Sequence, residues 1–523
     1  MNSLRSIFSK NLSLINFLVI FFFFIYSILI IRYQYDGHHI GLIYSNSLDF
    51  INGKKPYKEI FIQYGILTTI INSLILTVFD NKIFFINFFN SIFYSLGILI
   101  ISKTIKNFTN LNLSFLATTI ILFNHPIPWL PWPNYIAFFF ISIGMYLISI
   151  NRKNFFLIGI FFGLSILCRQ ELFIPIVISL VMYGIINFFF KIPFKFKKII
   201  LFIMGFTFPL FVFLIYLILS GLINYWIAYL QLPAIYLETY DTNLVNLILN
   251  FVIFFSTESF FSFIIFPQYF VISIILIFNT IILFLFLFKK IKINKEILFI
   301  LIVGILSSAL ALKIELFRLY TSVIFGLIPL LYFIDKIRNK DLRKKMFLSL
   351  FLPSIFSICF YPMGNNDLFK NINFVSSNLK VENEKFNYTV IPEQKIKIIN
   401  LINNLSNKCD VTYLENLTWD TIYSTITNNN RIRVMPYAHF KKSNYKQVDL
   451  IENIKNPNSS FINLINREIK RSNIILLITN NNNYYKNDKL EIGSNYKMIE
   501  IDETNIRGRP QILRIYYPTK CNI

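Results

Sequence analysis

A charge-free stretch near the start of the chain, LSLINFLVIFFFFIYSILII at residues 12–31, indicates the class of this protein. A helix needs about 20 apolar residues to cross the hydrocarbon core of a membrane, and it satisfies its backbone hydrogen bonds internally. The stretch lacks the small-residue cleavage site of a signal peptide, so we predict a membrane helix that is retained. Comparable apolar runs follow near residues 83–102, 113–124, 134–150, 155–168, 172–190, 199–220, 270–288, 296–312, 317–334 and 346–361.

The composition fits the same class. Of the 523 residues, 55% are hydrophobic and only 15% are charged, whereas soluble domains carry about 25% charged residues. We therefore predict an α-helical polytopic membrane protein with about eleven to thirteen transmembrane helices. The uncertain pair is 64–79 and 246–266, which either both span or both lie against the outer leaflet. Eleven is preferred, because thirteen would place Lys103 and Arg152 on the wrong side.

The net charge of +23 gathers in short clusters between the apolar runs. Lysine and arginine collect in this way in cytoplasmic loops. The pattern argues against nucleic acid as a partner, predicts a cytoplasmic N-terminus and puts the residues after Tyr361 outside. The clusters are Lys103 with Lys106, Arg152 with Lys153, and the segments 191–198, 289–295 and 336–345.

The composition changes after the last apolar run. We expect residues 1–361 to form the membrane domain and residues 362–523 a small extracytoplasmic α/β accessory domain. Within it, EQKIKIINLINNLS (393–406) is typical of an amphipathic helix, whereas SNIILLIT (472–479) and QILRIYY (511–517) are typical of strands.

Few residues of the tail suggest chemistry. Its lone histidine, His439, is more typical of a structural side chain than of a ligand. Cys409 and Cys521 form an even pair in an oxidising compartment, which permits a disulfide without establishing one.

The first outer loop, residues 33–63, is unusually rich in functional groups. Apolar residues recur at helical spacing with polar residues opposite, which predicts an amphipathic surface helix that ends at Asn52-Gly53. The apolar side comprises Ile40, Ile43, Tyr44, Leu48 and Ile51, and the side expected to face water comprises Ser45, Asn46, Asp49 and Asn52. Asp36 precedes this helix at the mouth of the bundle. Its carboxylate suits a general base or a metal ligand, but it equally suits an N-cap of the surface helix.

Three further outer segments carry polar residues. Charges at membrane depth are costly and tend to be functional, and cations gathered at one membrane face would suit a phosphate headgroup. Arg169 and Glu171 can also simply pair with each other. The segments are HPIPWLPWPNY (125–135), GLSILCRQEL (163–172) and LKIELFRLYTS (312–322).

These motifs, with YDGHHIG (35–41) and NGKKPYKEIFIQYG (52–65), resemble the GT-C superfamily of polyprenyl-phosphate-sugar-dependent glycosyltransferases. Within it, the likeness is greatest to the bacterial protein-mannosyltransferase and aminoarabinose-transferase-like branch. The resemblance covers residues 1–361. It implies a multi-pass protein of the bacterial plasma (inner) membrane, which transfers a sugar from a polyprenyl-phosphate donor to a lipid, glycan or protein with inversion.

The resemblance also implies residue roles. The first-loop acid is catalytic in the family, which points to Asp36. Many members have two adjacent acids there, whereas here Gly37 and two histidines follow. Glu59 or His38 is therefore the expected catalytic partner, with Asp49 and Glu171 as other sources of a second carboxylate.

Further roles are implied for the rest of the site. The expected donor-phosphate ligands are Arg318, Arg169 and Lys313. The resemblance leaves open whether the site binds a divalent cation, Mg²⁺ or Mn²⁺, for which Asp36 would be the ligand. The expected acceptor and pocket residues are His39, Tyr57, Gln63, Tyr64, His125, Trp132 and Glu171.

Two other functions stay open. A surface-polysaccharide polymerase or ligase would also be a multi-span protein with a functional outer loop, although its main loop usually comes late in the chain. A lipid or solute transporter would show internal repeats and polar residues near the midplane. The polar residues of this sequence lie at the outer face instead.

Overall fold

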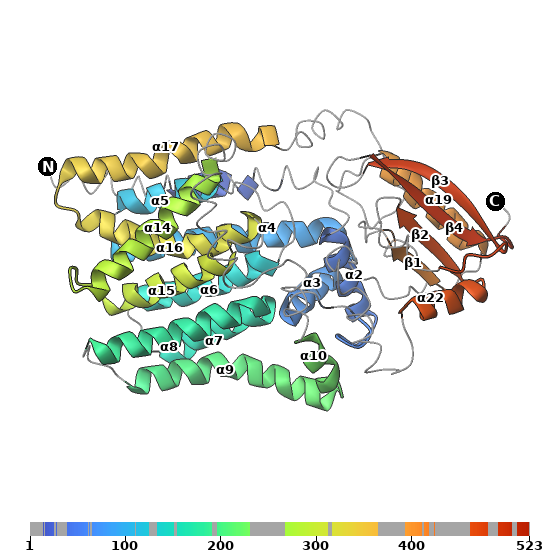
Figure 1. The fold of residues 1–523 in the computed structure, drawn as a ribbon, viewed down its shortest axis with the longest axis horizontal. Coiled ribbons are helices and arrows are strands. Elements are labelled where there is room, and N and C mark those ends of the chain that lie inside the picture. Colours follow the sequence, from blue (N-terminus) through green and yellow to red (C-terminus); the bar gives the residue numbers. More distant parts are fainter. Residues whose placement is uncertain are drawn as a thin grey trace. The chain divides into compact units, whose positions relative to one another are not determined.

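The computed structural model is mostly helical and carries a small sheet near its C-terminus, so the predicted fold class is confirmed (Figure 1). The residues that it describes are 14, 16–22, 24–25, 28, 39–60, 62, 65–109, 111–124, 133–150, 154–190, 196–230, 267–311, 316–364, 393–409, 413–417, 423, 461–479, 490–504 and 510–521.

The chain forms two compact units, each built from separate stretches of sequence. The first comprises Met1–Ile30, Phe88–Val212 and Leu247–Phe369. The second comprises Ile31–Asn87, Phe213–Asn246 and Lys370–Ile523. The second unit thus groups the first outer loop with the C-terminal tail. The proposed division into residues 1–361 and 362–523 stays a prediction.

The helices that lie wholly or mostly in the first unit follow the predicted apolar runs closely. Three of the described helices, α4, α8 together with the short η1 before it, and α9, are long and apolar enough to cross a membrane. The predicted count of eleven spans is not tested. The helices are α4 (Ile83–Phe108), α5 (Leu111–Asn124), α6 (Pro133–Ser149), α7 (Phe155–Cys168), η1 (Gln170–Leu172), α8 (Phe173–Phe189), α9 (Phe196–Leu219), α14 (Pro267–Leu287), α15 (Lys295–Ala311), α16 (Leu316–Lys336) and α17 (Lys340–Gly364).

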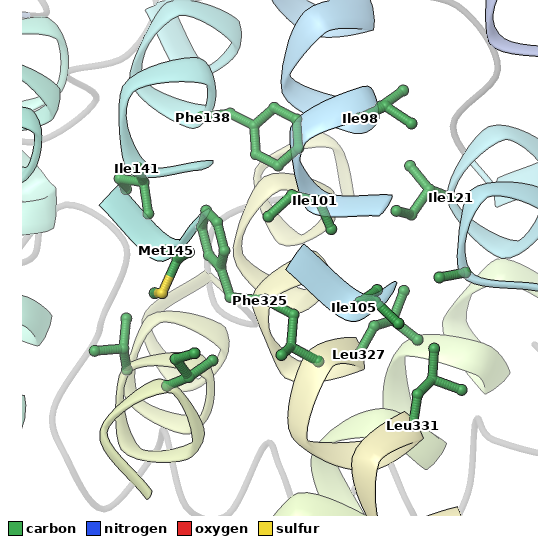
Figure 2. Close-up of a cluster of buried hydrophobic side chains, with 14 of the residues drawn as sticks. Ile98, Ile101, Ile105, Ile121, Phe138, Ile141, Met145, Phe325, Leu327 and Leu331 are labelled. Carbon is green, nitrogen blue, oxygen red and sulfur yellow. The ribbon is translucent and has the colours of Figure 1, made fainter. Parts of the chain in front are cut away.

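A cluster of branched aliphatic and aromatic side chains forms the core of this unit. Figure 2 shows Ile98 and Ile101 of α4 beside Phe138 of α6 and Phe325 of α16. The rings of Phe138 and Phe325 lie 5.8 Å apart. The core therefore joins helices that are far apart in sequence.

Polar side chains also connect helices inside this core. Asn16, in the first apolar run, donates from Nδ2 to Ser102 Oγ of α4 at 2.5 Å, and Ser102 Oγ lies 2.8 Å from Ser114 Oγ of α5. Asn279 of α14 donates to the Gly326 carbonyl of α16 at 2.9 Å. Such interhelical hydrogen bonds stabilise helix contacts in an apolar environment.

Helices α7 and α9 approach closely through glycines. Gly159 and Gly163 form a small-xxx-small pair on α7, and Gly205 lies on α9. A Cβ at Gly159 would overlap the Phe202 carbonyl oxygen, and a Cβ at Gly205 would overlap that of Phe156. Glycine is required at these positions because the backbone of the neighbouring helix occupies the space that a side chain would need, and backbone cannot rotate away as a side chain can.

Gly205→Leu is therefore expected to destabilise the bundle by about 1–3 kcal/mol through overpacking. Thermal unfolding of the purified chain, followed by size-exclusion chromatography, measures the effect. Gly184→Leu is the matched control, because a Cβ at Gly184 of α8 meets nothing within 4 Å. Equal unfolding temperatures of the two variants would contradict the close packing of α7 on α9.

Two short helices pack together in the second unit, one from the first outer loop and one from the apolar stretch 64–79 that follows it. They are α2 (His39–Ile51) and α3 (Ile66–Val78). The Ser73 hydroxyl of α3 donates to the Ser47 carbonyl of α2 at 3.1 Å, and the Tyr44 hydroxyl donates to the Asn81 carbonyl at 2.8 Å. The helix predicted over this part of the loop is therefore present.

The prediction of which side of α2 faces water is partly wrong. Ser45 and Ser47, on or beside the side expected to face water, are 1% and 0% exposed, whereas Ile51 is 36% exposed. The reason for the burial of Ser47 is the contact with α3, which covers that side of α2. The hydroxyl of Ser47 meets its hydrogen-bonding need by donating to the Ile43 carbonyl at 2.7 Å.

The C-terminal tail contains a four-stranded sheet of order β1-β2-β4-β3. Its strands are β1 (Tyr413–Leu417), β2 (Ile474–Thr479), β3 (Tyr496–Thr504) and β4 (Pro510–Pro518), and β1 pairs parallel with β2 while the other pairs are antiparallel. Helices α19 (Glu393–Cys409) and α22 (Phe461–Lys470) accompany it. The predicted helix and both predicted strands are confirmed. His439 lies outside the described residues.

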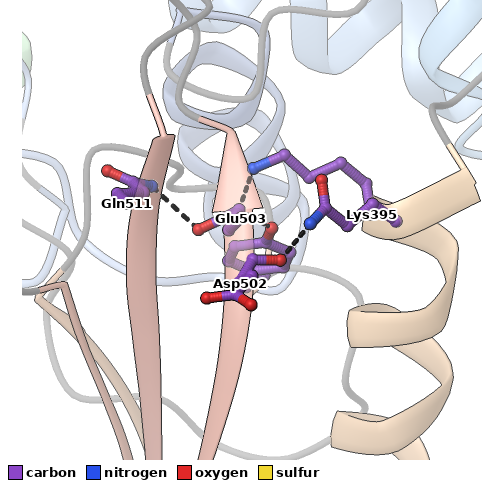
Figure 3. Close-up of polar contacts among 6 residues, drawn as sticks. Lys395, Asp502, Glu503 and Gln511 are labelled. Atoms are coloured by element: carbon purple, nitrogen blue, oxygen red, sulfur yellow. Dashed lines mark hydrogen bonds and ion pairs between the residues drawn. The ribbon is translucent and has the colours of Figure 1, made fainter.

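A buried ion pair connects α19 to the sheet (Figure 3). Lys395 Nζ contacts Glu503 Oε1, and Glu503 is 2% exposed. The carboxylate also accepts from Tyr423 Oη at 2.5 Å and from Gln511 Nε2 at 2.8 Å. Three donors from separate segments therefore meet one carboxylate.

The cysteines differ in state. Cys168, at the end of α7, is buried and is not in a disulfide, whereas Cys521 is buried and disulfide-bonded. Its expected partner Cys409 is the last residue of α19, and the Cys409 side chain lies outside the described part of the chain. The pairing of these two residues stays a prediction.

Candidate active site

The structure describes five of the predicted site residues with their side chains. Asp49, Tyr57 and Glu59 belong to the second unit, and Arg169 and Glu171 belong to the first. His39 is the first residue of α2, and Arg318 lies in the first turn of α16. The side chains of both lie outside the described part of the chain. The residues wholly outside it are Asp36, His38, Gln63, Tyr64, His125, Trp132 and Lys313.

The segment Lys55–Ile60 of the first outer loop forms a tight turn. The Lys55 carbonyl accepts from the backbone N–H groups of Glu59 at 2.8 Å and Ile60 at 3.2 Å. The Tyr57 N–H donates to the Ile60 carbonyl at 3.0 Å. Tyr57 has a φ of 65°, which a bulky side chain rarely adopts. A non-glycine residue in this conformation is expected only where its surroundings hold it there.

Aromatic packing holds Tyr57 in place. Its side chain is buried, and its ring lies 5.1 Å from that of Tyr229 in α10 (Ile223–Tyr229) and 6.2 Å from that of Phe213. Burial raises the pKa of the Tyr57 hydroxyl well above its usual range, and the neighbouring hydroxyl of Tyr229 adds to the effect. Tyr57 therefore stays neutral and serves the loop as an anchor.

The turn presents the carboxylate of Glu59 outward. Glu59 Oε2 accepts from the Lys55 backbone N–H at 2.7 Å, while the residue as a whole is exposed. One carboxylate oxygen thus fixes the side chain against its own turn. An oriented, solvent-accessible carboxylate can receive a proton or bind a hydroxyl group.

Arg169 follows the last turn of α7 as a buried cation. Its backbone N–H donates to the Ser165 carbonyl at 2.9 Å, and its conformation is extended, so the helix ends there. Arg169 is 8% exposed, and its Nε donates to Glu171 Oε2 at 2.5 Å. A buried guanidinium is costly without a partner. The alternative in which Arg169 and Glu171 pair with each other is therefore realised.

This pairing does not use all donors of Arg169. The guanidinium has five N–H groups in a fixed fork, and Glu171 engages Nε. Within the described part of the chain, Glu171 is the side chain with which Arg169 forms an ion pair. Phosphate binding by Arg169 would leave the Glu171 carboxylate to compete for the same cation.

The described residues contain no group of three histidine, cysteine or acidic side chains that could hold a metal ion. The expected ligand Asp36 is outside them. No catalytic step is therefore assigned to a metal.

Comparisons with known proteins add a structural likeness. Neither a protein-family model nor a curated protein matches the chain. Among solved structures, it is similar to the crystal structure of the Archaeoglobus fulgidus oligosaccharyltransferase in complex with Zn and sulfate, at 11% identity and a TM-score of 0.39. The match covers 79% of this chain and 62% of that one. At this identity and TM-score, the likeness assigns neither fold nor activity.

Proposed function

We propose that this chain is a membrane glycosyltransferase of the GT-C type. It moves a sugar from a polyprenyl-phosphate donor to an extracytoplasmic lipid, glycan or protein. The observation that carries the proposal is the turn at Lys55–Ile60, where buried Tyr57 anchors the loop and Glu59 presents its carboxylate to solvent. A mere connector between membrane helices would not need a strained, buried anchor beside an oriented acid.

The proposed reaction is a direct displacement. Asp36, with Glu59 or His38 as its partner, accepts the proton of the acceptor hydroxyl, and the acceptor oxygen attacks the anomeric carbon. The bond from that carbon to the phosphate oxygen breaks, and its electron pair leaves with polyprenyl phosphate. Attack from the face opposite the leaving group inverts the anomeric configuration.

Stabilisation of the leaving phosphate is the proposed role of the basic residues. Arg318 is the main phosphate ligand, and Arg169 and Lys313 have the same role. Charge-assisted hydrogen bonds from a guanidinium stabilise the charge that develops on the leaving group. The phosphate is already a good leaving group, so the proposal requires no separate acid catalyst.

Arg318→Ala is expected to weaken binding of polyprenyl phosphate about 10- to 100-fold, because a charge-assisted hydrogen bond is lost. Arg318→Lys should recover part of the affinity by keeping the charge without the fork. Binding of radiolabelled polyprenyl phosphate to the full chain in nanodiscs measures both effects. Arg338→Ala, an exposed residue just beyond the other end of α16, is the control.

Two results would count against this part of the proposal. Equal affinities of Arg318→Ala and Arg338→Ala would remove Arg318 from the phosphate site. Appearance of intact labelled lipid in the opposite leaflet, without release of its sugar, would favour a transporter.

A further inference from the structure

Two helices of the first unit carry buried polar side chains in their N-terminal halves. Asn90, Ser91 and Tyr94 lie on α4, and Asn134 and Tyr135 begin α6. Each is at most 4% exposed. All five are uncharged, so this polar group offers amides, hydroxyls and aromatic rings, and no ion.

The two helices run side by side in the same direction at this level. The ring of Tyr94 lies 5.1 Å from that of Tyr135 and 6.0 Å from that of Phe138, and Gly97 lies against Phe138. Residues later in α4 therefore contact residues later in α6, as expected for parallel helices. Asn134 precedes Phe138 by about one helical turn, and Asn90 precedes Tyr94 by the same distance. The two amides thus lie toward the same ends of α4 and α6.

Asn134 stands out within this group. It is 2% exposed, and among the residues that the structure describes neither its Nδ2 nor its Oδ1 has a hydrogen-bond partner. Burying a polar group without a partner costs stability, and a native protein rarely accepts the cost without a reason. An amide presents donors and an acceptor side by side. It can thus satisfy two neighbouring hydroxyl groups of one ligand.

The position of Asn134 in the bundle suggests which ligand this is. Phe138, one turn further along α6, contacts Phe325 of α16 (Figure 2). Position 318, the proposed phosphate ligand, precedes Phe325 by about two turns of α16. In the predicted topology, α4, α6 and α16 all begin at the outer face. A donor with its phosphate at Arg318 would therefore carry its sugar at the outer level of the bundle, where Asn134 lies.

We propose that Asn134 binds hydroxyl groups of a neutral hexose-type sugar on the lipid-linked donor, with Tyr94 and Tyr135 lining the same site. This rests on the proposed function. Binding sites of this kind combine apolar and aromatic surface with a few placed polar groups. A cationic or anionic sugar would require a countercharge, and these five residues supply none.

The test compares two lipids on the full chain in nanodiscs. One is a neutral hexosyl polyprenyl phosphate, and the other is polyprenyl phosphate without sugar. Wild type is expected to bind the hexosyl lipid more tightly. Asn134→Leu should lower affinity for the hexosyl lipid about 10-fold, as for the loss of a hydrogen bond, and leave affinity for the sugar-free lipid unchanged. Its unfolding temperature should stay equal or rise, because a similar apolar side chain replaces an unpaired amide.

Asn187→Leu is the matched control. Asn187 is equally buried, on α8, but its Nδ2 donates to the Tyr183 carbonyl within the same helix at 2.6 Å. Asn187→Leu should therefore not change the preference for the hexosyl lipid over the sugar-free lipid.

The outcomes separate the two proposals. If wild type and Asn134→Leu show the same preference, or wild type shows none, Asn134 is only a buried amide, and the proposed function still stands. If wild type binds neither lipid, the proposed function fails, and this inference fails with it.

Discussion

Asp36→Asn is expected to lower the turnover of lipid-linked sugar about 100- to 10,000-fold, the usual contribution of a general base. The asparagine keeps the size of the side chain and its ability to cap a helix, but it cannot accept the acceptor's proton. Donor affinity should change little, because the proposed phosphate ligands are untouched. Steady-state kinetics of the purified chain, with donor affinity measured separately, test both parts.

Two companion variants sharpen this prediction. Asp80→Asn is the control, because Asp80 lies in the same compact unit with a side chain that is 84% exposed, beside Lys82. Glu59→Gln tests the partner role, and a drop comparable to that of Asp36→Asn would make Glu59 the base. Full turnover by Asp36→Asn, together with a lowered unfolding temperature of Asp36→Ala, would instead assign Asp36 as a helix cap, because asparagine can cap a helix and alanine cannot.

Glu503→Gln is expected to destabilise the C-terminal tail by about 3–5 kcal/mol, because the ammonium of Lys395 would stay buried without a counterion. Glu503 also joins α19 to β3 and to Gln511 of β4, so the loss should reach the whole sheet. Amide hydrogen exchange in β2 and β4 of the full chain measures it. Exchange should accelerate by about two to four orders of magnitude.

Two controls isolate the cause. Arg514→Ala removes an exposed pair with Glu500, at 2.8 Å, and should cost about 0–1 kcal/mol. The double variant Lys395→Met with Glu503→Leu should recover most of the stability, because apolar residues of similar size can replace a buried pair. If Glu503→Gln changes hydrogen exchange no more than Arg514→Ala does, the Lys395–Glu503 pair does not contribute importantly to the stability of the tail.

The helices of the bundle could be predicted from sequence because two independent signals mark them. Apolar length indicates each helix, and lysine and arginine clusters between the apolar runs mark where the helices end. The observed α4 and α16 accordingly match the predicted runs 83–102 and 317–334 to within a few residues at their starts. The grouping of the first outer loop with the tail has no such local signal, since it depends on packing between distant segments.

The buried polar residues were harder to predict. Lys395 belongs to a predicted amphipathic helix, where a lysine is expected in solvent, yet the sheet 108 residues later buries it beside Glu503. Asn134 stands at the start of the predicted run 134–150, directly after prolines and tryptophans, so nothing local distinguishes its buried amide from an exposed residue at a helix end. The Lys55–Ile60 turn was predictable from Pro56 and from Gly53 just before it. The burial of Tyr57 was not, because it requires Phe213 and Tyr229, which lie far away in sequence.

The most direct test of the central claim is the fate of a lipid-linked sugar incubated with the purified wild-type chain in nanodiscs and a mixed pool of lipid, glycan and protein acceptors. Mass spectrometry follows the lipids and the acceptors together. The account predicts that polyprenyl phosphate accumulates in step with a newly glycosylated acceptor, and that Asp36→Asn forms neither. Lipid-linked sugar that stays intact with every donor and acceptor tried, or turnover that is equal in Asp36→Asn, would contradict it.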